Sequence, residues 1–306
     1  MEVTVSNTPE VIPQQGSFPT VPVSHVVPSE ADDLPVTIIE RKPGWHFLNL
    51  RELWRFRELL FILVWRDIKV RYKQTVLGAA WAILQPLATM VAFSLFFGRV
   101  ASNPDAAVPY PIFVFAGLLA WTFFSSAVTA ASTSVIGNER LVTKVYFPRI
   151  LVPLSAVVAA TVDFAIAFVM LLILMPFFGC WPSWSLLAVP AMVLLIILAA
   201  SSLGVLLSAL TVAYRDFRYV VPFTIQLWMF ATPAIFLQNL EVLGPRTNLL
   251  LPLNPLHGLV VNFRAAALGG PFDWPALAVS AASGLVLFVV SSLYFRRVER
   301  TFADVI

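Results

Sequence analysis

Residues 50–86 read LRELWRFRELLFILVWRDIKVRYKQTVLGAAWAILQP, a basic segment that runs directly into an apolar one. On a helical projection the charged positions cluster on one side; they are Arg51, Arg55, Glu58, Arg66, Lys69 and Lys73. The other side carries Leu53, Trp54, Leu60, Phe61, Val64 and Ile68. A helix of this kind lies along a membrane surface, with its cations among the lipid phosphates. We therefore predict an amphipathic interfacial helix over residues 46–75, followed by a membrane span from residue 76.

The composition of the whole chain is that of an integral membrane protein. Hydrophobic residues make up 59% of its 306 residues and charged residues only 12%, with a mean hydropathy of +0.83. Soluble domains carry roughly 25% charged residues. Six stretches reach the roughly 17–25 apolar residues that a membrane span requires; they are 76–97, 110–134, 150–178, 186–212, 220–237 and 274–295. We predict an all-α integral membrane fold with six transmembrane helices.

Positive charge is distributed unevenly between the two sets of loops. Fifteen Lys and Arg residues lie before the first span, in the second and fourth connections and in the tail, with Arg41 and Lys42 further out on the same side. The opposite side has only Arg99, Arg246 and Arg264. Cytoplasmic loops carry the excess of Lys and Arg. We therefore place both termini in the cytoplasm, and the basic balance does not indicate a nucleic-acid partner.

Two segments lie outside this pattern of spans. Residues 1–45 are polar and Pro-rich, which predicts a disordered cytoplasmic tail. The last outer loop, 238–273, contains Asn254-Pro255, a helix-start signal, and Gly269-Gly270, a stop signal. We predict a short outer-face helix between these signals, before the last span. It is either a simple interfacial helix or a re-entrant element that shapes the exit of a pathway.

Sequence motifs for catalysis and for nucleotide binding are missing. The chain has no G-x-x-x-x-G-K-[ST], so we expect no nucleotide site of its own. It has no H-E-x-x-H and no G-x-S-x-G, and the adjacent acids Asp32 and Asp33 lie in the predicted tail. Cys180 is the single cysteine, and the three histidines are far apart, so no metal site is predicted. We expect a protein that is not an enzyme and binds no cofactor.

Asp163 is the one acid near the centre of a predicted span, residues 150–178. A charge at that depth costs at least a few kcal/mol unless it is paired, hydrated or protonated. Its two interpretations are a hydrogen bond to Ser, Thr or Trp on a neighbouring helix, or a position facing a hydrated pathway or subunit interface. We expect Asp163 to face protein or water rather than lipid.

Aromatic side chains make up 13% of the chain, and they are numerous in the first two spans. Rings in a polar pathway can stack on the apolar faces of sugars, although most rings in such a protein face lipid or pack between helices. With Asp163, the pathway candidates are Trp81, Phe93, Trp121 and Phe124.

Five segments together resemble a known family. They are VWRDIKVRYKQTVLGAAWAILQPL (64–87), GNERLVTKVYFPRILVPLS (137–155), YRDFRYVVP (214–222), LNPLHGLVVNFRAAALGG (253–270) and YFRRVERTFADVI (294–306). In this order, and with six predicted spans, they are similar to the ABC-2-type permeases that export O-antigen, capsule and teichoic acid polysaccharides. The resemblance covers residues 46–306, of which 76–306 would form the six-span permease domain. Residues 1–45 fall outside it.

This resemblance implies a homodimeric channel in the bacterial inner membrane, moving a lipid-linked glycan with two copies of a separate ATP-binding subunit that hydrolyses ATP. It implies that the 137–149 loop docks into that subunit, with Leu141, Val142 and Val145 filling a groove in the partner. The coupling residues it implies are Asn138, Glu139, Arg140, Leu141, Lys144, Tyr146, Arg215 and Asp216. It also makes the basic segment a cytoplasmic entrance, where Arg66, Lys69, Arg71 and Lys73 would meet lipid phosphate. Without the resemblance, these cations equally fit positive-inside topology and headgroup anchoring.

Three other functions remain open from the sequence. An ion-coupled secondary transporter would favour internal repeats and broken helices, and no repeat is evident. A glycan-modifying membrane enzyme would need a cluster of ionisable groups at membrane depth. An ABC-2 exporter of a drug or another lipid would share every feature described above.

Overall fold

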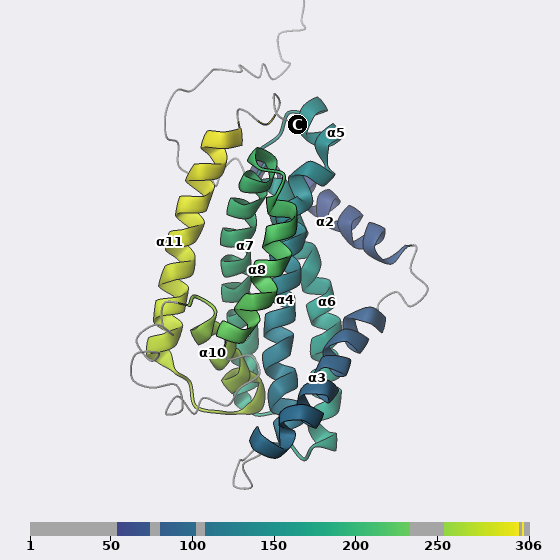
Figure 1. Ribbon diagram of the computed structural model, residues 1–306, viewed down its shortest axis with the longest axis vertical. Helices are drawn as coiled ribbons and strands as arrows, with labels where there is room; N and C mark the ends of the chain where they lie inside the picture. Colours follow the sequence, from purple (N-terminus) through teal and green to yellow (C-terminus); the bar gives the residue numbers. More distant parts are fainter. Residues whose placement is uncertain (1–53, 74–79, 102–107, 233–253, 300–301, 303–306) are drawn as a thin grey trace, which may run out of the picture. The chain divides into compact units, whose positions relative to one another are not determined.

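Helices form all the regular secondary structure that the computed structural model describes, namely residues 54–73, 80–101, 108–232, 254–299 and 302 (Figure 1). These residues belong to one unit, Trp45–Ile306. The predicted tail 1–45, the outer ends of the predicted helix 46–75 and the loop segment 238–253 lie outside the described residues. Arg51, Arg246 and the ends of two predicted spans, 76–79 and 233–237, also lie outside them. Within the described part of the chain, the all-α prediction is confirmed.

Five of the described helical segments are long and apolar enough to cross a membrane. They are α3 (Ala80–Ala101), α4 (Tyr110–Gly137), α6 (Leu151–Phe177), the 3-10 turn η1 (Trp184–Ala188) continued by α7 (Val189–Ala213), and α11 (Trp274–Val298). Each one matches a predicted span to within a few residues, because long uninterrupted apolar runs determine them locally.

The predicted span 220–237 corresponds in part to α8 (Phe217–Ala231). At about 1.5 Å per residue, the 15 residues of α8 extend roughly 22 Å, less than the hydrocarbon thickness of about 30 Å. The described residues therefore confirm five of the six predicted spans by length and composition, and the sixth stays a prediction.

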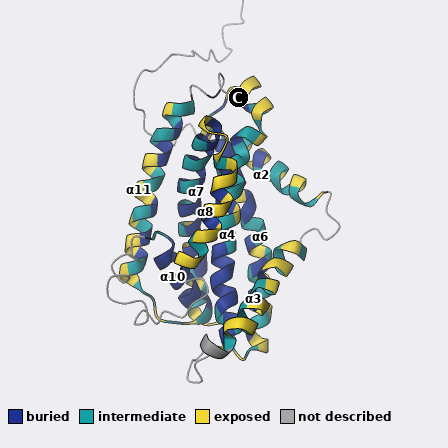
Figure 2. Ribbon diagram, in the orientation of Figure 1, coloured by how far each residue is buried: buried dark blue, intermediate teal, exposed yellow. Residues whose placement is uncertain are grey.

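Helix α4 forms the centre of the bundle. Most of its residues are buried, and it packs mainly against α6 and α7 (Figure 2). Gly204 of α7 lies so close to α4 that an added Cβ would come within 2.6 Å of the Ala131 Cβ. Several hydroxyls at the helix contacts donate to carbonyls of their own helices, as where Thr122 donates to the Leu118 carbonyl at 2.7 Å and Ser202 donates to the Ala199 carbonyl at 2.7 Å. Small residues and such hydroxyls let these helices pack closely.

The basic segment contains α2 (Arg57–Tyr72), whose exposed side carries charged and apolar residues together, where the sequence predicted two separate sides. Arg55, Glu58 and Lys69 are exposed, and so are Phe61, three residues after Glu58, and Trp65, four residues before Lys69. The opposite side, which includes Leu63 and Asp67, packs against α6. The interfacial position of this helix remains a prediction.

The loop predicted to lie on the outer side contains α10 (His257–Leu268), which is buried along His257–Ala267 and packs against α4, α7 and α11. A helix lying flat on a membrane surface would expose one side, so the simple interfacial interpretation does not describe α10. The helix starts at His257 rather than directly after Asn254, because the Asn254 side chain first accepts the Leu256 N–H at 3.0 Å in a turn. It ends at Gly269, as predicted. The φ of Gly269 is +80°, in the left-handed region that glycine adopts without steric cost.

Candidate functional site

The short helix α5 (Glu139–Lys144) connects α4 to α6 at the end of the bundle that the charge pattern assigns to the cytoplasm (Figure 1). The Asn138 side chain donates to the Ser134 carbonyl at 2.8 Å and so closes the end of α4. The Asn138 carbonyl then accepts the Val142 N–H at 3.0 Å and begins α5. Asn138 therefore makes the corner between the two helices.

The predicted coupling residues of this segment are largely exposed. Glu139, Arg140 and Lys144 are open to solvent, Leu141 is half-buried, and Tyr146 is 75% exposed. Val142 is different: it is buried in a cluster with Leu63 of α2, so the expectation that it fills a groove in a partner is wrong. It anchors α5 to its own chain instead, and Val145 remains exposed.

The second predicted coupling segment is the turn between α7 and α8. Tyr214, Arg215 and Asp216 are exposed there, at the same end of the bundle as α5 (Figure 1). Tyr219, which the sequence did not single out, is exposed one helical turn later. The two segments together present acidic, basic and aromatic side chains at one end of the molecule, and a coupling role for them stays a prediction.

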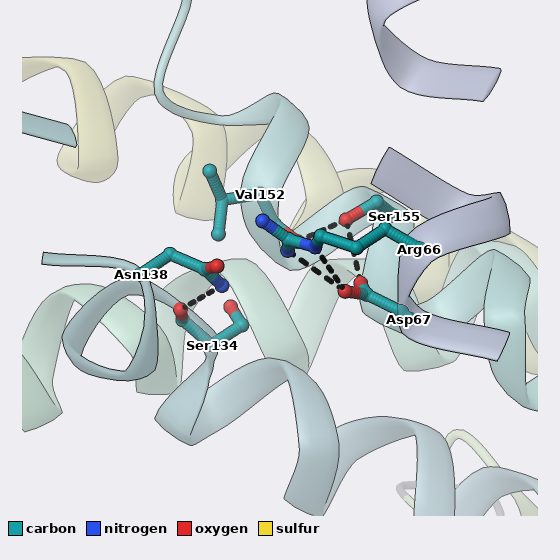
Figure 3. A network of polar contacts seen from close by, with 6 residues as sticks. All are labelled: Arg66, Asp67, Ser134, Asn138, Val152 and Ser155. Atoms are coloured by element: carbon teal, nitrogen blue, oxygen red, sulfur yellow. Dashed lines mark hydrogen bonds and ion pairs between the residues drawn. The ribbon is translucent and has the colours of Figure 1, made fainter. Parts of the chain in front are cut away.

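Two of the predicted entrance cations contact groups on their own helix. Arg66 donates to its neighbour Asp67 at 2.8 Å, and the Lys69 Nζ lies 5.3 Å from the centroid of the Trp65 ring. Asp67 in turn accepts from Ser155 of α6 at 3.2 Å, and the Arg66 side chain points toward the α4–α5 corner (Figure 3). Lys73 is exposed. Lys69 and Lys73 are therefore the most accessible of the four cations.

Arg71, the fourth predicted entrance cation, forms an ion pair with Asp163 in the middle of α6, and the Tyr72 hydroxyl donates to the same carboxylate. Asp163 therefore faces protein, as predicted, but its partners come from the basic segment and not from a Ser, Thr or Trp. Burial, followed by the hydrogen bond to Asp163, raises the pKa of Tyr72, which keeps the hydroxyl protonated as a donor.

The sequence reasoning missed Asp67, Tyr72 and Ser155 as parts of this contact. One signal could have found it: Asp67 and Arg71 are four residues apart and therefore share one face of a helix. The same face carries Leu59 and Leu63, so it is expected to be buried against another helix. Charged side chains on a buried face need a polar partner on that other helix.

The aromatic pathway candidates lie in different environments. Trp121 and Phe124 are buried inside the protein, where the Phe124 ring meets Trp228 edge-on at 5.8 Å. Trp81 is 57% exposed, and Phe93 is half-buried and stacks on Phe97 at 5.8 Å. In this conformation Trp121 and Phe124 are core residues, so only Trp81 and Phe93 are accessible at the surface of the chain.

Arg264, counted above as one of few cations on the outer side, is buried in α10. Its guanidinium carbon lies 3.7 Å from the centroid of the Phe113 ring in α4. A buried guanidinium over an aromatic face is favourable by about 2 kcal/mol or more. This contact fastens α10 to the N-terminal part of α4.

Residues 58–266, which begin in α2 and end in α10, match the family model of the ABC-2 type transporter. The chain belongs to the ABC-2 type transporter family. It is 33% identical over 254 residues to the O-antigen export system permease protein RfbA of Myxococcus xanthus, covering 82% of this chain and 96% of that protein. It is 25% identical over 251 residues to RfbA of Klebsiella pneumoniae, covering 81% and 95% respectively.

A shorter match, 30% identical over 84 residues, joins this ABC-2 chain to the polysialic acid transport protein KpsM of Escherichia coli, covering 28% of this chain and 31% of that protein. The resemblance drawn from the sequence is thereby confirmed. This ABC-2 family member is a multi-pass membrane protein, consistent with the five apolar helices found in its described residues.

Proposed function

We propose that this chain is the membrane permease of an ABC exporter that moves a lipid-linked, O-antigen-like polysaccharide outward across the bacterial cytoplasmic membrane. The observation that carries this proposal is the likeness to O-antigen export permeases along 95–96% of their own length. A likeness along nearly the whole length of those permeases supports a common transported class more strongly than a shared motif would.

A separate ATP-binding subunit supplies the energy. Permeases of this class work with such subunits, and the chain contains no phosphate-binding loop. The exposed side chains of α5, with Arg215 and Asp216 of the next turn, form the surface that the subunit contacts. Two copies of the chain and two ATP-binding subunits form the transporter, which makes this chain a transport component and not an enzyme.

The positive-inside pattern supports a topology with both termini in the cytoplasm. Among the described residues, α5, the α7–α8 turn and the C-terminal end of α11 gather at one end of the bundle, and they carry its exposed loop cations (Figure 1). In this topology α10 lies at the outer end. Lys69, Lys73 and their neighbours in α2 then lie on the cytoplasmic side, where a lipid-linked substrate enters.

Deletion of the gene, followed by analysis of surface glycans and of lipid-linked precursors, tests this function. We expect the surface polysaccharide to disappear and its precursor to accumulate inside the cell, with both effects reversed by the wild-type gene. Unchanged glycans together with retention of another lipid would contradict the polysaccharide assignment and identify an ABC-2 exporter with a different cargo.

A further inference from the structure

Two residues at the cytoplasmic end of the bundle, Arg149 and Glu299, cap each other's helices. Arg149 lies two residues before α6, and Glu299 is the last residue of the helical path of α11. The Arg149 backbone N–H donates to the Glu299 carboxylate at 2.9 Å, and the Arg149 guanidinium donates to the Glu299 backbone carbonyl at 2.5 Å. Each side chain therefore satisfies a backbone group of the other residue.

The charges of the two side chains suit the helix ends that they meet. The carboxylate lies at the N-terminus of α6, where the helix dipole favours an anion, and the guanidinium lies at the C-terminus of α11, where it favours a cation. Ile150, the residue before α6, has no side chain that can cap the helix. The contact thus supplies an end group that the local sequence lacks.

A second contact joins the same elements independently of the caps. Phe302, just beyond α11, is fully buried, and its ring meets Phe295 edge-on at 5.3 Å. Both rings belong to the cluster that holds Val142 of α5 and Phe147 of the α5–α6 connection. The buried side of the segment predicted to dock the ATPase therefore shares one apolar cluster with the C-terminal end of α11.

The other end of α11 holds α10. The Gly258 N–H donates to Ser280 Oγ at 3.1 Å, and the Asn262 side chain exchanges two hydrogen bonds of 2.9 Å with the Asp273 backbone. Helix α11 is therefore one continuous element that contacts the α5–α6 connection through Arg149 at its cytoplasmic end and α10 at its outer end.

We propose that the reciprocal cap between Arg149 and Glu299 is a positioning contact for energy coupling: it makes α11 follow the movement of α5 and α6 when the ATP-binding subunit acts on them, and so transmits that movement toward α10. This inference rests on the proposed function and adds to it the residues that carry the movement. Arg149 and Glu299 do not touch the nucleotide or the substrate.

The complete transporter, purified with its ATP-binding subunit and reconstituted in liposomes, provides the test. The alanine variants Glu299→Ala and Arg149→Ala each lose one cap, whereas Glu299→Gln keeps an acceptor and Arg149→Lys keeps a donor. We expect both alanine variants to retain the ATP-binding subunit and its KM for ATP, while export per ATP hydrolysed falls roughly threefold to tenfold, the range expected for one lost capping bond. The conservative variants should keep at least half of the wild-type ratio, and Val290→Ala, which shortens an exposed side chain of α11, serves as the control.

The pairing of each side chain with the backbone of the other residue gives a further test. Because each side chain contacts a backbone group, the double exchange Arg149→Glu with Glu299→Arg should not restore coupling, as it would for a simple ion pair. Wild-type export per ATP in both alanine variants would overturn the inference, as would an equal loss in the conservative variants or rescue by the exchange. Failure of the alanine variants to insert or to retain the ATP-binding subunit would also overturn it, because the contact would then be only structural. Failure of the wild-type chain itself to bind an ATP-binding subunit would instead refute the proposed function.

Discussion

Arg71 of α2 and Asp163 of α6 form an ion pair although 92 residues separate them in the chain. The basic segment before the first span and the acid in the middle of a later span are therefore parts of one contact. It fastens α2 along the N-terminal half of α6, because Asp67 of α2 also meets Ser155, eight residues before Asp163 in α6. The entrance proposed for the substrate is thus built on a helix that the protein holds by charge as well as by apolar packing.

The substitution Asp163→Leu should destabilise the protein because it leaves the Arg71 guanidinium without its carboxylate. Breaking a buried pair costs about 3–5 kcal/mol, and we expect roughly 1–3 kcal/mol here since the two side chains keep 34% and 25% of their exposure. Thermal unfolding in detergent measures this loss. The double variant Asp163→Leu with Arg71→Leu should recover part of it, and a double variant no more stable than Asp163→Leu would argue against the pair.

The substitution Gly258→Ala should loosen α10 from α11. An added Cβ would lie 2.1 Å from the backbone oxygen of Ala276, and a backbone atom cannot move aside as a flexible side chain can. Overpacking of this kind costs about 1–3 kcal/mol. Gly137→Ala is the matched control because its Cβ would meet nothing within 4 Å. Equal melting temperatures for the two variants would show that the close approach is unimportant.

Neutralising Lys69 and Lys73 together, as Lys69→Gln with Lys73→Gln, should lower export without lowering stability. Each cation near an anionic lipid surface contributes about 1 kcal/mol of attraction, so the apparent affinity for the lipid-linked substrate should fall roughly tenfold or more. Transport assays at several substrate concentrations measure the effect, with Arg218→Gln, at an exposed cation outside α2, as a control for loss of charge. An unchanged affinity would indicate that these lysines only anchor α2.

Adding Arg66→Gln and Arg71→Gln to that variant should change a different property. Both arginines pair with acids, so their loss should reduce insertion and stability as well as export. Comparing the amount of inserted protein with its export rate separates the two effects. If the quadruple variant inserts and unfolds like the wild type, none of the four cations is needed for stability, and all four would then act in substrate binding.

Reversing the charges of α5, as Glu139→Lys with Arg140→Glu, should weaken binding of the ATP-binding subunit. Both side chains are exposed, so the fold should be unaffected. Capture of the subunit by tagged permease and stimulation of its ATP hydrolysis measure the result, which we expect to be roughly a tenfold loss of affinity from two like-charge contacts. Thr143→Ala, an exposed neutral position on the same helix, is the control. Full capture and stimulation by the reversed variant would place the docking surface elsewhere.

The substitutions Phe124→Ala and Trp81→Ala should separate core aromatics from surface aromatics. Phe124 is fully buried, so its removal should cost about 3–5 kcal/mol of stability. Trp81 is more than half exposed, so its removal should leave unfolding nearly unchanged and alter export only if the ring meets the substrate. A stable Phe124→Ala protein with impaired export would contradict the core assignment.

The sequence by itself determined which segments are helical and, through the distribution of Lys and Arg, which loops share a side. Both properties are local: an apolar run of sufficient length forms a span whatever its neighbours are, and Gly269 ends α10 through its own φ. The polar corner at Asn138 and the exposure of Glu139 and Tyr146 were likewise within reach of sequence reasoning.

Only the tertiary structure decided which side chains meet. Asp163 is paired with Arg71, Val142 faces its own chain, and Phe124 is a core residue, because helices far apart in sequence bring their faces together. The Arg149–Glu299 cap joins residues 150 positions apart, and the periodicity of the sequence does not predict which distant residues meet. Hydropathy and helical period describe each helix separately, whereas the energy of pairing its polar groups depends on the helix beside it.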